Sequence, residues 1–87
     1  MGDPIQNMGA DKKNMAMIIL RRIYVDHTSG GSGVSVETLR EATGAMLVGF
    51  EDVMNFLYYN NYINLDSKKN LYLLTQLGIN QVQSEYR

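Results

Sequence analysis

The apolar positions of the chain first become periodic after Asp11, where they recur at three- and four-residue steps. This spacing places them along one face of a helix, and an aspartate side chain readily accepts hydrogen bonds from the first backbone N–H groups of a helix. We therefore predict a first helix capped by Asp11. Its buried face comprises Met15, Ile19, Leu20 and Ile23.

Two polar stretches without apolar periodicity flank this first helix. Residues 1–10 mix glycine and proline with polar side chains, which predicts a disordered N-terminal tail. Residues 27–33, HTSGGSG, contain three glycines that are costly to order, so the helix is expected to end there. We expect these two stretches to be the most mobile parts of the chain, and residues 11–87 to form one domain.

The strongest periodic pattern lies in the middle of the chain, on both sides of a single glycine. Residues 34–36 are short enough to be a stub of strand, and Ser35 can cap a second helix through Thr43. Gly44 is expected to end that helix. A third helix is predicted from about residue 46 to residue 60, with a buried stripe of Phe50, Val53, Met54 and Leu57.

The last part of the chain changes to short apolar runs around a polar turn. YINL (62–65) and LYLL (71–74) have the β-branched and aromatic content of strands, and DSKKN (66–70) between them predicts a hairpin. Thr75 can cap a final helix. The fold class is therefore mainly α with a small β-hairpin (α+β), and one face of the final helix comprises Ile79, Val82 and Tyr86.

This order of elements, together with two local motifs, resembles winged helix-turn-helix domains. LREATGAMLVGFEDVMNFLYYNNYI (residues 39–63) is similar to the two-helix core of that family, with Gly44 at the turn between the helices. YLLTQLG (residues 72–78) is similar to the Tyr-x-Leu-Thr-x-x-Gly pattern that often closes the second wing strand. The resemblance implies a three-helix core with a wing and a C-terminal helix over nearly the whole chain.

For function, the resemblance implies binding of double-stranded DNA, commonly by a dimeric transcription regulator whose third helix enters the major groove. Asn55, Glu51 and Asp52 lie at positions that face the groove in this family. There Asn55 would bind the edge of an adenine, and Glu51 and Asp52 could accept hydrogen bonds from cytosine. Met46 and Gly49 would also face the groove. The full set of nucleic-acid-binding candidates comprises Arg40, Leu47, Val48, Glu51, Asp52, Asn55, Lys68 and Lys69.

The same third helix also supports an alternative, a winged-helix protein–protein interaction module that does not bind DNA. Carboxylates on its open face repel phosphates, and apolar residues at its exposed start have no obvious core to enter. A contiguous apolar and aromatic patch marks an interaction surface. The candidate partner interface comprises Leu47, Val48, Phe56, Tyr58 and Tyr59, and self-association through it would give a homodimer.

The charged residues leave both interpretations open. Lys68 and Lys69 at the hairpin turn either present charge to a DNA backbone or keep the turn solvated and discourage edge pairing. Arg21 and Arg22 either contact phosphates or form the solvent-facing side of the first helix. The formal net charge is -1, whereas dedicated nucleic-acid binders usually carry an excess of Lys and Arg.

No combination of residues predicts an enzyme. The chain has no cysteine and one histidine, His27, so no metal-ligand cluster or disulfide framework can be assembled. Glu51 and Asp52 point about 100° apart on a helix and cannot act together on one substrate. We expect no catalytic activity and no cofactor. The absence of a run of about 18 apolar residues argues against a membrane span, and the lack of cysteine suits a reducing cytoplasm.

Overall fold

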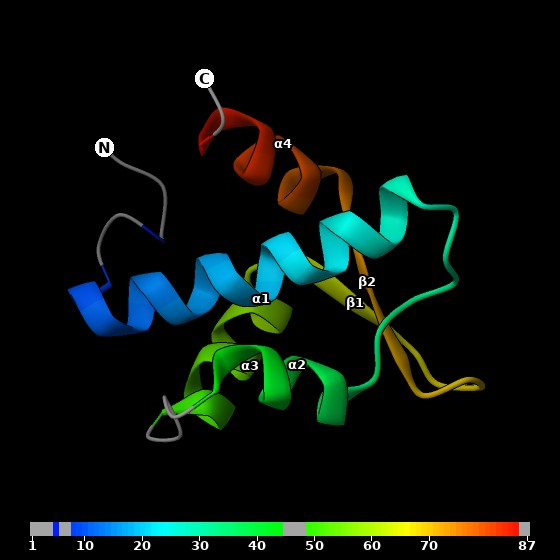
Figure 1. The fold of residues 1–87 in the computed structure, drawn as a ribbon. Coiled ribbons are helices and arrows are strands. Elements are labelled where there is room, and N and C mark those ends of the chain that lie inside the picture. The colour runs from blue at the N-terminus through cyan, green and yellow to red at the C-terminus, as the bar shows by residue number, and fades with distance from the viewer. Residues whose placement is uncertain (1–4, 6–7, 45–48, 86–87) are drawn as a thin grey trace.

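Four helices and one β-hairpin make up the part of the protein that the computed structural model describes, residues 5, 8–44 and 49–85 (Figure 1). The prediction of a mainly helical chain with a small hairpin, an α+β class, is confirmed. In chain order the elements are α1 (Ala10–Thr28), α2 (Val36–Thr43), α3 (Phe50–Tyr59), β1 (Ile63–Asp66), β2 (Leu71–Leu74) and α4 (Gln76–Glu85).

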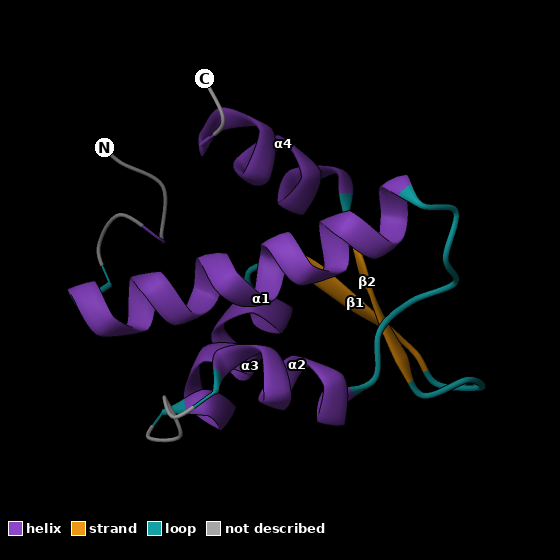
Figure 2. Cartoon of the chain, in the orientation of Figure 1, coloured by secondary structure: helices purple, strands orange, loops and turns teal. Residues whose placement is uncertain are grey.

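Helix α1 lies at the centre of this arrangement. It contacts α2, α3, α4 and β2, and Figure 2 shows α4 on one side of it and α2 with α3 on the other. Because neighbours cover α1 from more than one side, its buried surface is wider than the single stripe predicted from periodicity. The four predicted residues are buried, and Ala16 and Met17 are buried with them.

The predicted buried stripe of the third helix is confirmed. The stripe Phe50, Val53, Met54 and Leu57 is buried in one cluster together with Leu39 of α2. At the start of α2 the side chain of Ser35 accepts a hydrogen bond from the backbone N–H of Thr38, at 3.3 Å. At its end Gly44 has a φ of 61°, a conformation that favours glycine. Both ends of α2 therefore lie where the sequence predicted them.

Helix α3 begins later than predicted, at Phe50 and not near residue 46. Gly49 immediately before it has a φ of 89°, which lies in the left-handed region and interrupts any helix that would run through it. The N-terminal end of α3 is therefore set at Gly49. The predicted site residues Leu47 and Val48, like Met46, fall outside the described residues.

The N-terminal region also departs from its prediction. Helix α1 begins at Ala10, its N-cap is Gly9, and Asp11 lies in its first turn and does not cap it. Ile5 is buried in the core and Met8 packs against it, whereas the disorder predicted for residues 1–10 stays a prediction. Two isolated apolar residues carry no periodic signal, and only the folded chain shows where they pack.

The glycine-rich stretch is anchored and not free of contacts. Helix α1 continues through His27 to Thr28, and the Asp26 carboxylate then accepts a hydrogen bond from the backbone N–H of Gly33, at 2.9 Å. Val34 pairs with Tyr72 as an isolated antiparallel bridge, in place of the predicted stub of strand. The loop is thus held at one end by α1 and at the other by β2, although its mobility stays a prediction.

The hairpin and the start of α4 form one closely packed unit, as predicted. Strands β1 and β2 are antiparallel, with Ile63 paired to Leu74. The Thr75 hydroxyl accepts a hydrogen bond from the backbone N–H of Gly78 at 3.2 Å, which caps α4. A Cβ on Gly78 would lie 2.2 Å from the carbonyl oxygen of Tyr62, so glycine is required for this approach. Along α4, Val82 is buried and Ile79 half-buried, whereas Tyr86 is outside the described residues.

We expect Leu57→Ala to lower the free energy of unfolding by about 2–5 kcal/mol, because it removes a fully buried leucine from the centre of the core. Leu77→Ala is the matched control, since Leu77 is 48% exposed, and it should cost less than about 1 kcal/mol. Denaturant unfolding followed by circular dichroism measures both values. Equal losses for the two variants would contradict the placement of Leu57.

A second pair of variants checks the packing of α4 on the hairpin. Gly78→Ala should destabilise the protein by about 1–3 kcal/mol, because the added methyl group collides with backbone and not with a flexible side chain. Gly9→Ala, at a helix N-cap with open space around it, should cost less than about 1 kcal/mol. Thermal melts of the two variants should therefore differ clearly, and a Gly78→Ala protein as stable as Gly9→Ala would refute the close approach.

Candidate functional site

The exposed side of α3 brings together five of the residues that the sequence marked for function. Its buried residues face the core, and five others face outward. At 3.6 residues per turn, these five positions fall within an arc of about 120°. We call this surface the α3 face, and it comprises Glu51, Asp52, Asn55, Tyr58 and Tyr59.

Two adjacent tyrosines form the C-terminal end of the α3 face. Tyr59 is 77% exposed and Tyr58 is 42% exposed, and their rings meet edge to face with centroids 5.4 Å apart. Phe56 is half-buried and packs against the core, so it is not the exposed anchor that the sequence allowed. The two tyrosines therefore carry the aromatic part of the predicted partner interface.

Two carboxylates form the N-terminal end of the α3 face. Glu51 and Asp52 lie in the first turn of α3, where the helix dipole favours negative charge. The preceding N-cap, Gly49, has no side chain to cap the helix, so these acids also have a local structural role. Asp52 Oδ2 lies 4.0 Å from Lys12 Nζ of α1, in a well-exposed pair of the kind that contributes about 0–1 kcal/mol.

Arg40 of α2 lies beside the α3 face but directs its charge onto an aromatic ring. Its guanidinium carbon is 4.9 Å from the centroid of the Phe50 ring, within the range of a cation–π contact. It borders two shallow depressions, one shared with Glu51 and Asp52 and the other with Glu51, Asn55 and Tyr72. The structure thus brings Arg40 together with the predicted groove-facing residues of α3.

Lys68 and Lys69 lie apart from this group. Both side chains are exposed, and both backbone N–H groups donate to Oδ1 of Asp66, at 3.1 and 3.3 Å, which fixes the shape of the turn. The turn projects away from the helices at the far end of the hairpin (Figure 1). Neither lysine lines the depressions beside α3. Those predicted nucleic-acid-binding residues that the structure describes are therefore divided between two separate places.

A third depression extends the α3 face onto the hairpin. It begins at Tyr58 and Tyr59 and continues along the start of β1. Sequence reasoning missed its other residues, because their proximity to α3 depends on how the hairpin packs and no local pattern encodes it. These residues are Asn61, Ile63, Asn64 and Thr75.

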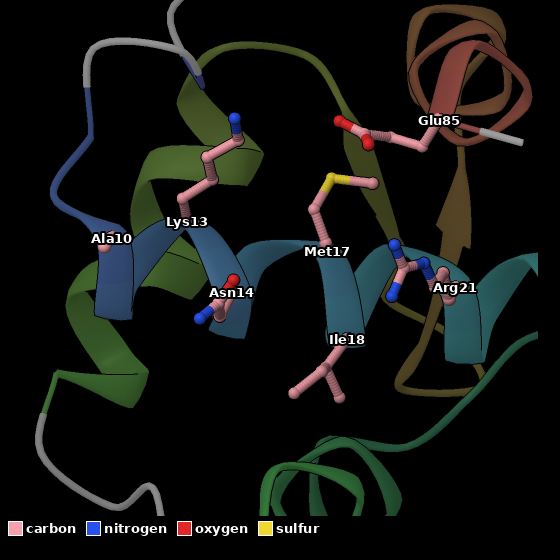
Figure 3. A pocket seen from close by; sticks show the side chains of 7 residues that line it. All are labelled: Ala10, Lys13, Asn14, Met17, Ile18, Arg21 and Glu85. Atoms are coloured by element: carbon pink, nitrogen blue, oxygen red, sulfur yellow. The ribbon is translucent and has the colours of Figure 1, made fainter. Parts of the chain in front are cut away.

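The cleft between α1 and the end of α4 was not expected from the sequence. Figure 3 shows Glu85 of α4 directed toward Met17 of α1, with Lys13 and Arg21 also lining the cleft.

Across the described residues, no group of three or more His, Cys, Asp or Glu side chains is placed to hold a metal ion. Among the same described residues, every buried side-chain nitrogen or oxygen has a hydrogen-bond partner.

Comparison with known proteins gives no relative for this chain: no family model, no curated protein and no solved structure matches it. None of the described helices combines the length and apolar character required to cross a membrane.

Neutralising the α3 carboxylates should leave the protein folded. Glu51→Gln/Asp52→Asn removes two favourable charges near a helix N-terminus and one weak ion pair, a loss of about 0.5–2 kcal/mol. Glu85→Gln, at the C-terminal end of α4, should leave stability unchanged or raise it slightly, because negative charge is unfavourable there. Urea unfolding would test both, and a loss above about 3 kcal/mol in the double variant would exclude a surface location for the two acids.

Proposed function

We propose that this chain is a winged-helix protein-interaction module, without enzymatic activity, that binds a partner protein through the α3 face. The observation that carries the proposal is the exposure of Tyr58 and Tyr59 on the same arc of α3 as Glu51 and Asp52. Tyrosine is enriched at the centres of protein interfaces, where its ring supplies contact area at a small entropic cost. A reducing, cytoplasmic setting would suit a chain without cysteine.

Several features of the fold support the winged-helix part of the proposal. The order of three helices, a hairpin and a last helix is the order of that family, and the hairpin would be the wing. The cap formed by Thr75 and the close approach of Gly78 to Tyr62 fit the motif on which the resemblance rests.

The charge on α3 favours a protein over DNA as the partner. The helix has two carboxylates on its exposed face and no Lys or Arg anywhere in its sequence, Phe50–Tyr59. A helix that enters the major groove passes between two rows of phosphates, and each carboxylate weakens that electrostatic attraction. Asn55 alone has the chemistry to read a base edge. The partner could also be a second copy of the chain, which would make the protein a homodimer.

DNA binding as a transcription regulator is the second candidate function. The exposed positions of Lys68 and Lys69 on the hairpin turn favour it, because a wing presents charge to the DNA backbone from this place. Arg40 is exposed beside α3 and could add a third phosphate contact. These cations would hold a duplex against the repulsion from Glu51 and Asp52.

A titration with mixed-sequence duplex DNA at low salt separates the two functions. If the chain is a protein-interaction module, neither the wild type nor Glu51→Gln/Asp52→Asn should bind the duplex measurably by fluorescence anisotropy. If it binds DNA, the double variant should bind several-fold more tightly, because two repulsive charges are gone. Lys68→Ala/Lys69→Ala should then bind more weakly and reduce the salt dependence by about two phosphate contacts.

Site-directed crosslinking tests the proposed interaction directly. A photoreactive p-benzoylphenylalanine in place of Tyr59, in the full chain expressed in its native host, should give one discrete protein adduct. The same group in place of the exposed Gln83 of α4 serves as the control and should not give that adduct. Adducts of the same pattern from both positions, together with duplex binding by the wild type, would reject the proposal in favour of DNA binding.

A further inference from the structure

We infer that the α3 face takes a basic segment of the partner protein, with Lys or Arg side chains placed against Glu51 and Asp52 and over the ring of Tyr59. The inference rests on the proposed function and adds the chemistry of the partner to it. Three features of the face carry it: its charge, the cation that α1 already places at its rim, and the tyrosine pair.

The charge of the α3 face is negative and little compensated by the chain itself. Of the nearest cations, Arg40 lies over the Phe50 ring, and Lys12 approaches Asp52 at the edge of the face. Within the described part of the chain, Glu51 has no ion-pair partner. An incoming Lys or Arg would therefore meet a carboxylate that is exposed and ready to pair.

The ion pair between Lys12 and Asp52 shows how a cation approaches the N-terminal end of the α3 face. The ammonium group reaches the carboxylate from outside α3, with its alkyl chain near Gly49, where a built Cβ would lie 3.7 Å from Lys12 Cε. This separation is ordinary van der Waals contact, so the stem of Lys12 lies beside the N-cap of α3. A basic side chain from a partner could use the same kind of approach to Glu51, one position earlier in the helix.

The tyrosine pair provides a second contact for the proposed basic segment, because a cation can lie over the exposed ring of Tyr59. The edge-to-face contact with Tyr58 orients the Tyr59 ring, which remains 77% exposed. A guanidinium or ammonium group over such a ring gains about 0.5–1 kcal/mol at an exposed site. Arginine is the better fit, because its planar group both stacks on an aromatic ring and pairs with a carboxylate through two hydrogen bonds.

The dimensions of the face set the size of the segment. Glu51 and Tyr59 are eight residues apart in one helix, which corresponds to about 12 Å along its axis. Two basic side chains on an extended segment would span that distance if they were about four residues apart. Beyond the tyrosines, the depression along β1 offers Asn61 and Asn64 to the backbone of such a segment.

Peptide titrations followed by amide chemical shifts test the inference, with hexa-arginine, hexa-lysine and hexa-glutamate as probes on the full chain. Hexa-arginine should cause saturable shifts at residues 51–59, hexa-lysine weaker ones and hexa-glutamate none. Glu51→Gln/Asp52→Asn and Tyr59→Ala should each weaken hexa-arginine binding at least five-fold. Tyr59→Phe should bind as the wild type does, because it retains the ring.

A charge-matched control separates specific recognition from general attraction. Glu37→Gln/Glu85→Gln removes the same number of exposed carboxylates from α2 and α4 and should leave hexa-arginine binding within two-fold of the wild type. An equal loss in this control, or no saturable binding of hexa-arginine to the wild type, would overturn the inference. If the crosslink from position 59 still formed, that result would overturn only the basic segment, and the proposed protein-interaction function would stand. If the crosslink were also absent, both the inference and the proposed function would be rejected.

Discussion

The burial of α1 between two groups of elements is the constraint on which the rest of the structure depends. Its apolar residues Ile19, Leu20 and Ile23 are almost completely removed from water, and α2, α3, α4 and β2 all pack against it. The buried apolar residues that the structure describes form one cluster, as expected for a small chain, and α1 contributes six of them. The other helices are therefore oriented by the need to turn their apolar stripes toward α1.

This constraint decides which side of α3 reaches solvent. With Val53 and Leu57 fully buried, the opposite arc has to carry the charged and aromatic residues outward. Glu51 and Asp52 there suit the N-terminal turn of the helix, so their presence has a structural reason as well as the functional one proposed above. The exposed tyrosines have no such local reason, because their contribution to the core is small. They are the stronger functional signal.

The separation between the α3 face and the hairpin turn explains why the charge pattern of the sequence was ambiguous. Lys68 and Lys69 carry positive charge at the far end of the hairpin, whereas the helix that would enter a DNA groove carries negative charge. Read along the chain, these residues formed one candidate set. In the folded protein they are two surfaces of opposite sign, and a partner that binds one of them need not contact the other.

Local patterns were enough to predict the order of elements, the cap at Ser35, the end of α2 at Gly44 and the stripe from Phe50 to Leu57, because each depends on residues close in sequence. The start of α3, the burial of Ile5 and the anchoring of the loop by Asp26 could not be predicted in this way. Each depends on partners distant in the chain or on a single backbone conformation, as at Gly49. The same holds for the candidate site: its residue types were visible in the sequence, but only the packing of α3 against α1 and the hairpin determined which of them share a face.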